Sequence, residues 1–86
     1  MARDIDRILV EVRGFLPSAT SSQLQVRHAG VDDDGVWFFR LGEREVQVES
    51  STGVCPFLVE GNGTDDRYVG HTVREIVAQI VRWLQR

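Results

Sequence analysis

The sequence contains no lysine, and arginine supplies all ten of its basic residues. An enzyme that forms a Schiff base, including one that uses pyridoxal phosphate, needs a lysine amine, and a P-loop needs one as well. The absence of lysine therefore excludes these classes of chemistry.

Cysteine is also scarce, because Cys55 is the only one in 86 residues. A single cysteine excludes an internal disulfide and a zinc site built from several cysteines. It favours a reducing compartment, and the charged N-terminal segment lacks the apolar region of a signal peptide. We therefore predict a cytoplasmic protein.

Long apolar runs are missing too. None approaches the ~20 residues that span a bilayer, so we expect no membrane partner. Positive charge is not in excess either, since the formal net charge is −3. Because phosphate binding draws its affinity from clustered positive charge, we also expect no nucleic-acid partner.

The chain has the length of one small domain, residues 1–86, with an amphipathic segment at each end. In the N-terminal segment, apolar residues recur with the 3.6-residue period of a helix: Ile5, Ile8, Leu9, Val12 and Leu16. Gly14 and then Pro17 end this helix, because proline cannot continue it. In the C-terminal segment, Thr72 and Glu75 have the spacing of a capping box. The apolar stripe that follows contains Val73, Ile76, Val77, Ile80 and Leu84.

Between the helices, apolar and polar residues alternate as they do in short strands. The predicted strands are residues 23–29, 36–41, 44–49 and 54–60, with a turn at 31–35. Gly42 and Glu43 join the second strand to the third, and glycine at the first position of a two-residue loop is typical of a type II′ turn. This turn predicts five cross-strand pairs: Leu41–Arg44, Arg40–Glu45, Phe39–Val46, Phe38–Gln47 and Trp37–Val48.

One face of this sheet is apolar, and two helices with single apolar stripes need a surface to cover. The predicted fold is therefore α+β: a two-layer sandwich with the N- and C-terminal helices packed on one face of an antiparallel meander of three to four strands. Its full order is α-β-β-β-β-α. Pro56 places the fourth strand at an edge, because proline cannot donate to a ladder. Either Cys55, Phe57 and Val59 or the opposite set faces the core, depending on the preceding turn.

Few residues could carry chemistry. Three aspartates and a glycine at positions 32–35 have the composition of a calcium loop, but the strand at 36–41 interrupts that loop, so a hairpin turn is favoured. His28, His71 and Cys55 are residue types of nucleophile–base pairs and metal sites, and nothing in the sequence brings them together. We predict no catalytic, cofactor-binding or metal site.

The outer face of the predicted sheet is not fully polar, and it is the predicted partner-binding surface. Its residues are Arg27, Val36, Phe38, Arg40 and Leu58. In the predicted register Arg27 lies beside Phe38, and Leu58 shares a row with Arg40. Either the stem of Arg27 simply covers Phe38, or the apolar residues form a patch for another protein, rimmed by charge.

The first strand, residues 23–29, is predicted to lie at an edge of the sheet, where it could pair with a strand of another chain. The predicted partner is another protein or a second copy of the chain, which would make a homodimer. We therefore predict a small soluble protein that acts as a non-catalytic protein-interaction module. The alternative is a small enzyme or metal-dependent protein that uses His28, His71 or Cys55.

Overall fold

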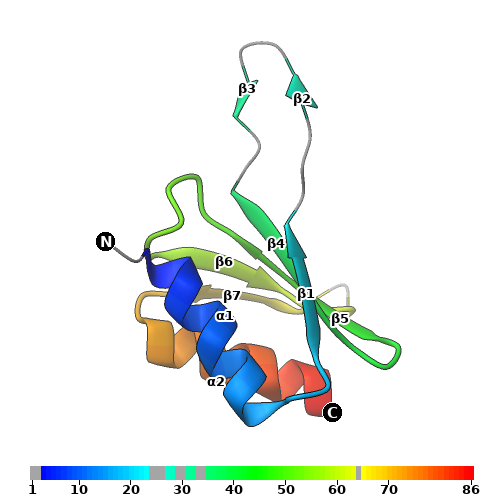
Figure 1. Cartoon of the computed structure of the whole chain (residues 1–86). Helices are drawn as coiled ribbons and strands as arrows, with labels where there is room; N and C mark the ends of the chain where they lie inside the picture. The colour runs from blue at the N-terminus through cyan, green and yellow to red at the C-terminus, as the bar shows by residue number, and fades with distance from the viewer. Residues whose placement is uncertain (1–2, 24–26, 29–30, 33–34, 64) are drawn as a thin grey trace.

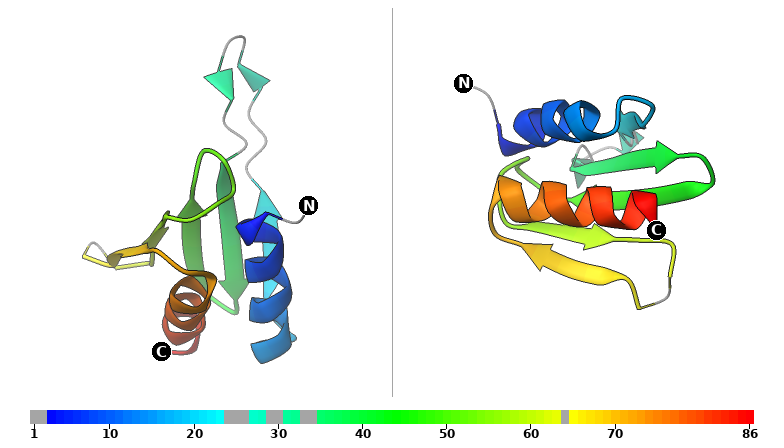
Figure 2. Two further views of the ribbon diagram at one scale, coloured as in Figure 1. Left: turned by 90° about the vertical axis from the view of Figure 1, so that its left-hand side faces the viewer. Right: turned by 90° about the horizontal axis from the view of Figure 1, so that it is seen from below.

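The computed structural model describes residues 3–23, 27–28, 31–32, 35–63 and 65–86, and it shows two helices on one face of an antiparallel sheet (Figure 1, Figure 2). The elements along the chain are α1 (Asp4–Phe15), β1 (Thr20–Gln23), β2 (Arg27–His28), β3 (Val31–Asp32), β4 (Val36–Leu41), β5 (Arg44–Glu49), β6 (Phe57–Glu60), β7 (Arg67–Gly70) and α2 (Val73–Gln85). The main sheet has the strand order β1-β4-β5-β6-β7, and β2 pairs with β3. The predicted α+β sandwich is confirmed, and its sheet has five strands where three to four were expected.

Helix α1 forms where the apolar period predicts it. Its stripe is buried through Ile5, Ile8 and Val12. At its start the Arg3 backbone N–H donates to Asp6 Oδ2 (2.9 Å), which satisfies one of the N–H groups that a helix leaves without a partner.

Helix α2 begins at the predicted capping residues. Thr72 Oγ1 accepts from the Glu75 backbone N–H (3.1 Å), and Glu75 Oε2 accepts from the His71 backbone N–H (3.0 Å). The two side chains thus satisfy backbone donors reciprocally at the helix start. The buried residues of α2 are Ile76, Val77, Ile80 and Leu84.

The β4–β5 hairpin has the predicted register throughout, from Leu41 opposite Arg44 to Trp37 opposite Val48. Gly42 has a φ of 61°, whereas Glu43 does not have a positive φ. That combination fits the predicted type II′ turn, because a type I′ turn needs positive φ at both positions.

The first predicted strand is wrong in its limits. Strand β1 covers Thr20–Gln23 and pairs with β4, while Arg27 and His28 belong to β2, which pairs with β3 where a turn was expected. Residues 24–26 of the predicted strand lie outside the described residues. Strand β1 contains no apolar residue, so the sequence shows no apolar–polar alternation there. It forms a strand because its backbone pairs with β4.

The predicted strand at 54–60, which contained Pro56 and was placed at an edge, is also wrong in its start and its position. Strand β6 begins at Phe57 and lies between β5 and β7. Because Pro56 precedes the strand, its missing N–H removes no ladder hydrogen bond. Phe57 and Val59 are fully buried and Cys55 is half-buried beside the core. Of the two alternatives that the sequence left open, the set of Cys55, Phe57 and Val59 therefore faces the core.

The core lies between the helices and the inner face of the sheet. Trp37, Phe39, Val46 and Val48 are buried there, as predicted. The fifth strand, β7, adds the buried Gly70. The side chain of Ile76 packs so closely on it that a Cβ at this position would collide. The loop before β6 is tied to α1, since the Ile5 backbone N–H donates to Gly53 O (3.0 Å).

Candidate functional site

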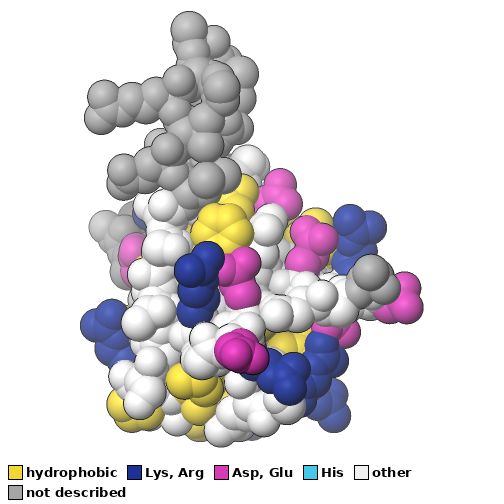
Figure 3. Space-filling model, turned by 90° about the vertical axis from the view of Figure 1, so that its right-hand side faces the viewer, with side chains coloured by type: hydrophobic (Ala, Val, Ile, Leu, Met, Phe, Trp, Pro, Cys, Tyr) yellow, Lys and Arg dark blue, Asp and Glu magenta, His cyan; other side chains and the backbone are white. Residues whose placement is uncertain are grey.

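The predicted partner-binding residues of β4 lie together on the outer face of the sheet. Val36 and Phe38 are half-buried and Arg40 is exposed, while the residues between them face the core. Leu58 on β6 is also half-buried on this face. Figure 3 shows this face, opposite the helices, with hydrophobic side chains among arginines and acidic residues.

The predicted rows across this face are wrong. Phe38 lies opposite Ser22, whereas Arg27 lies opposite Asp32 in the β2–β3 pair. Leu58 lies opposite Glu49 and Val69 instead of sharing a row with Arg40. Both shifts have one cause: the strands that flank the β4–β5 hairpin start at other residues than the alternation suggested. Arg27 therefore cannot cover Phe38 through the predicted strand pairing.

Among the described residues of the outer face, four charges compensate one another in pairs, whereas the exposed Glu49 forms no ion pair. Arg40 pairs with Glu45 across the β4–β5 hairpin, and Arg67 pairs with Glu60 (3.7 Å) across β6 and β7. Exposed pairs of this kind add little to stability. These pairs leave the outer face with few uncompensated charges that could attract a partner.

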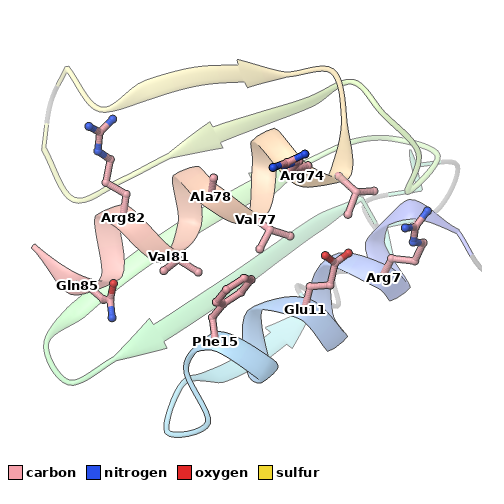
Figure 4. Close-up of a pocket in the computed structure, with 10 residues that line it drawn as sticks. Arg7, Glu11, Phe15, Arg74, Val77, Ala78, Val81, Arg82 and Gln85 are labelled. Atoms are coloured by element: carbon pink, nitrogen blue, oxygen red, sulfur yellow. The ribbon is translucent and has the colours of Figure 1, made fainter.

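A second surface lies between the helices, where α1 and α2 enclose a groove of about 760 Å³ (Figure 4). A row on α1 forms one side: Arg7, Glu11 and Phe15. A row on α2 forms the opposite rim: Arg74, Ala78 and Arg82. The floor is apolar and consists of Val73, Val77 and Val81. Figure 4 shows Val77 and Val81 pointing toward α1 and Phe15 pointing toward α2.

The groove differs from the sheet face in its charges and in its exposed apolar surface. Its arginines, Arg7, Arg74 and Arg82, make no ion pair with any residue that the structure describes. Phe15 is 67% exposed, although it is a large aromatic residue. The groove thus combines an apolar floor with three arginines and one glutamate, and none of these four charged side chains forms an ion pair with a described residue.

Sequence reasoning missed this groove because it followed only the main apolar stripe of each helix. Phe15 and Val81 lie beside those stripes, and Arg7, Glu11 and Phe15 recur every four residues on α1. The apolar residues next to each main stripe were the sequence feature that could have indicated it. They indicate a groove only when it is known that the two helices lie side by side.

The three residues of the alternative hypothesis are not joined into a site within the described chain. His71 is exposed, and no hydrogen bond links it to Cys55; the side chain of His28 lies outside the described residues. The Cys55 backbone N–H donates to Asp4 Oδ2 (2.9 Å). Burial raises the pKa of the Cys55 thiol to about 11, and hydrogen bonding to Asp4 and the negative charge of Asp4 add to this increase. The thiol therefore stays protonated at neutral pH and is a weak nucleophile there.

Two further features bear on the function. Among the described residues, no three histidine, cysteine, aspartate or glutamate side chains gather as a set that could hold a metal ion. Within the same residues, neither helix combines the length and the apolar character that crossing a membrane requires.

Comparison of the chain with models of protein families, with curated proteins and with solved structures finds no match.

Proposed function

We propose that this protein is a non-catalytic interaction module that binds a partner protein in the groove between α1 and α2. One observation carries the proposal: the groove leaves Phe15 largely exposed above a floor of valines. Aromatic residues that fill a partner's pocket contribute much of the binding energy at protein interfaces. A cytoplasmic location belongs to this proposal and rests on the single cysteine.

The helix pair is suited to binding because it is rigidly placed. Both helices bury their main stripes in the core, and the capping bonds of Thr72 and Glu75 hold the start of α2. A partner would therefore meet a preformed surface, and binding would cost little ordering of the backbone.

The outer face of the sheet is a second candidate surface. Strand β1 lies at an edge of the sheet and adjoins Phe38, which favours pairing with another strand or with a second copy of this chain. The paired charges of this face make it the weaker candidate, because they leave little electrostatic attraction for a partner.

Site-specific photo-crosslinking tests the two surfaces against each other. The photoreactive residue p-benzoylphenylalanine would replace Phe15 in the groove and, in a separate variant, the half-exposed Val69 on the sheet face. Each variant would be expressed in the cells that make the protein and irradiated. We expect a discrete protein adduct from position 15 and none from position 69.

A matched substitution checks that the adduct depends on the groove. Ala78→Glu places a larger, charged side chain on its rim at an exposed helix position, and it should abolish the adduct while the far-UV circular dichroism stays unchanged. No adduct from position 15 would overturn the proposal. An adduct from position 69 alone would transfer the function to the sheet face, and an adduct of twice the chain's mass would identify the partner as a second copy.

A further inference from the structure

We infer that the occupant of the groove is an amphipathic α-helix of the partner protein that carries acidic residues along the edge of its apolar stripe. This inference rests on the proposed function and adds the chemical class of the partner. It follows from the charge, the shape and the spacing of the groove residues.

The charge of the groove is opposite in sign to that of the whole chain. The chain has a net charge of −3, yet the groove contains three arginines and one glutamate. Arg3, Arg40, Arg67 and Arg86 form ion pairs elsewhere, whereas Arg7, Arg74 and Arg82 pair with no described residue. An incoming carboxylate would therefore meet guanidinium groups that are not yet compensated, which favours an acidic partner.

The apolar floor determines which kind of acidic partner fits. A highly charged polyanion gains nothing from the exposed Phe15 or from the half-buried Val73 and Val81, whereas an amphipathic segment can bury its apolar side chains on them. An extended segment would leave backbone N–H and C=O groups without partners against these valines, at a cost in free energy. A helix satisfies its own backbone and presents only side chains, so it is the better occupant.

The spacing of the arginines sets the pattern of acidic residues on the partner. Arg74 and Arg82 lie eight residues apart on α2, which is about 12 Å along the helix axis. A partner helix that lies along α2 matches them with carboxylates about two turns apart, at positions i and i+7 or i and i+8. Its apolar residues then recur at i+3 and i+4 intervals to contact the floor and Phe15.

Three synthetic peptides test this inference on the whole protein. The first is a 16-residue helix-forming peptide with a leucine stripe and glutamates two turns apart on its flank. The second has glutamine in place of each glutamate, and the third has the composition of the first in an order without a stripe. Fluorescence anisotropy gives the dissociation constants, and amide chemical shifts locate each bound peptide on the protein.

We expect the glutamate peptide to bind about tenfold more tightly than the glutamine peptide, because two exposed ion pairs in the upper part of the ordinary range together give about that factor. Its advantage should shrink at high salt, and the shifts should centre on α1 and α2. The triple variant Arg7→Gln/Arg74→Gln/Arg82→Gln should remove this advantage, so that it binds the glutamate and glutamine peptides equally. The control Arg13→Gln/Arg44→Gln removes two exposed arginines that do not line the groove and should change neither affinity.

The outcomes separate this inference from the proposed function. Equal binding of the glutamate and glutamine peptides would overturn the acidic preference, and tight binding of the peptide without a stripe would overturn the helical occupant. If neither striped peptide binds although the adduct forms at position 15, the inference fails and the proposed function stands. If the adduct itself is absent, the proposed function fails.

Discussion

At the scale of single residues, the contact with Asp4 controls the reactivity of Cys55. The two residues lie far apart in the sequence, and the hydrogen bond from the Cys55 backbone N–H brings the carboxylate beside the thiol. Burial and the nearby negative charge both disfavour the thiolate. The only cysteine of the chain is thus kept in its less reactive form.

Thiol reactivity gives the first prediction. At pH 8, a pKa of about 11 in place of 9.0 lowers the thiolate fraction about 100-fold, and the greater intrinsic nucleophilicity of a more basic thiolate recovers roughly tenfold of this. We therefore expect Cys55 to react with 4,4′-dithiodipyridine about tenfold more slowly in the folded protein than in urea. Asp4→Asn should raise the folded rate, because it removes the negative charge. Asp6→Asn, with the same charge change two residues along α1, should have little effect. Equal rates in the folded and unfolded chains would contradict the account.

The same shift makes stability depend on pH in a defined window. In the folded state the thiol pKa is raised, so between pH 9 and about 11 the unfolded chain loses its proton while the folded chain retains it. The contribution of this thiol to stability is therefore complete below pH 9 and declines as the pH rises toward 11. Urea titrations across this window should show that the free energy of unfolding of the wild type falls with rising pH, and that this contribution is missing in Cys55→Ala.

At the scale of elements, the β4–β5 hairpin depends on one turn residue. Gly42 has a positive φ, and a Cβ built there would meet no atom within 4 Å. Any cost of a substitution at this position must therefore come from the backbone conformation and not from a collision.

Gly42→Val should destabilise the protein by about 1–3 kcal/mol, because a β-branched residue resists positive φ. Glu43→Val introduces the same side chain one position later, where φ is not positive, and should cost much less. Urea denaturation of both variants measures the difference. Equal losses would show that the conformation of the turn is not what requires glycine.

At the scale of the whole molecule, the two sides of the sheet have different roles. The inner face is covered by α1 and α2 and forms the core, while the outer face is open in the isolated chain (Figure 2, Figure 3). Phe38 and Phe39 are neighbours in sequence, yet Phe39 is 1% exposed and Phe38 is only half-buried on the outer face.

This pair allows a matched test of the two-layer architecture. Phe39→Ala should cost about 3–5 kcal/mol, because it leaves a cavity in the core, and such a loss unfolds many small domains. Phe38→Ala should cost about 1 kcal/mol, the typical loss for a single substitution, because the half-buried ring leaves no cavity in the core. Thermal unfolding of the two variants checks the order, and a larger loss for Phe38→Ala would reverse the assignment of the faces.

The sequence alone determined the parts of this protein that depend on neighbours along the chain. The period of Ile5, Ile8 and Val12 placed α1, and Thr72 and Glu75 placed the start of α2. The turn at Gly42 set the register of β4 and β5, and with it the residues that face the core. In each case the cause is local: a helical or strand period, a cap or a turn conformation acts over a few residues.

Only the tertiary structure decided the rest, because partners distant in sequence supply the cause. Strands β1 and β7 have four residues each and no clear alternation, so they become strands through the ladders that β4 and β6 offer them. Pro56 could not indicate whether its strand lay inside the sheet or at an edge, since that depends on where β7 pairs. The interhelical groove exists because the core brings α1 and α2 together, and neither helix by itself shows that Phe15 would remain uncovered between them.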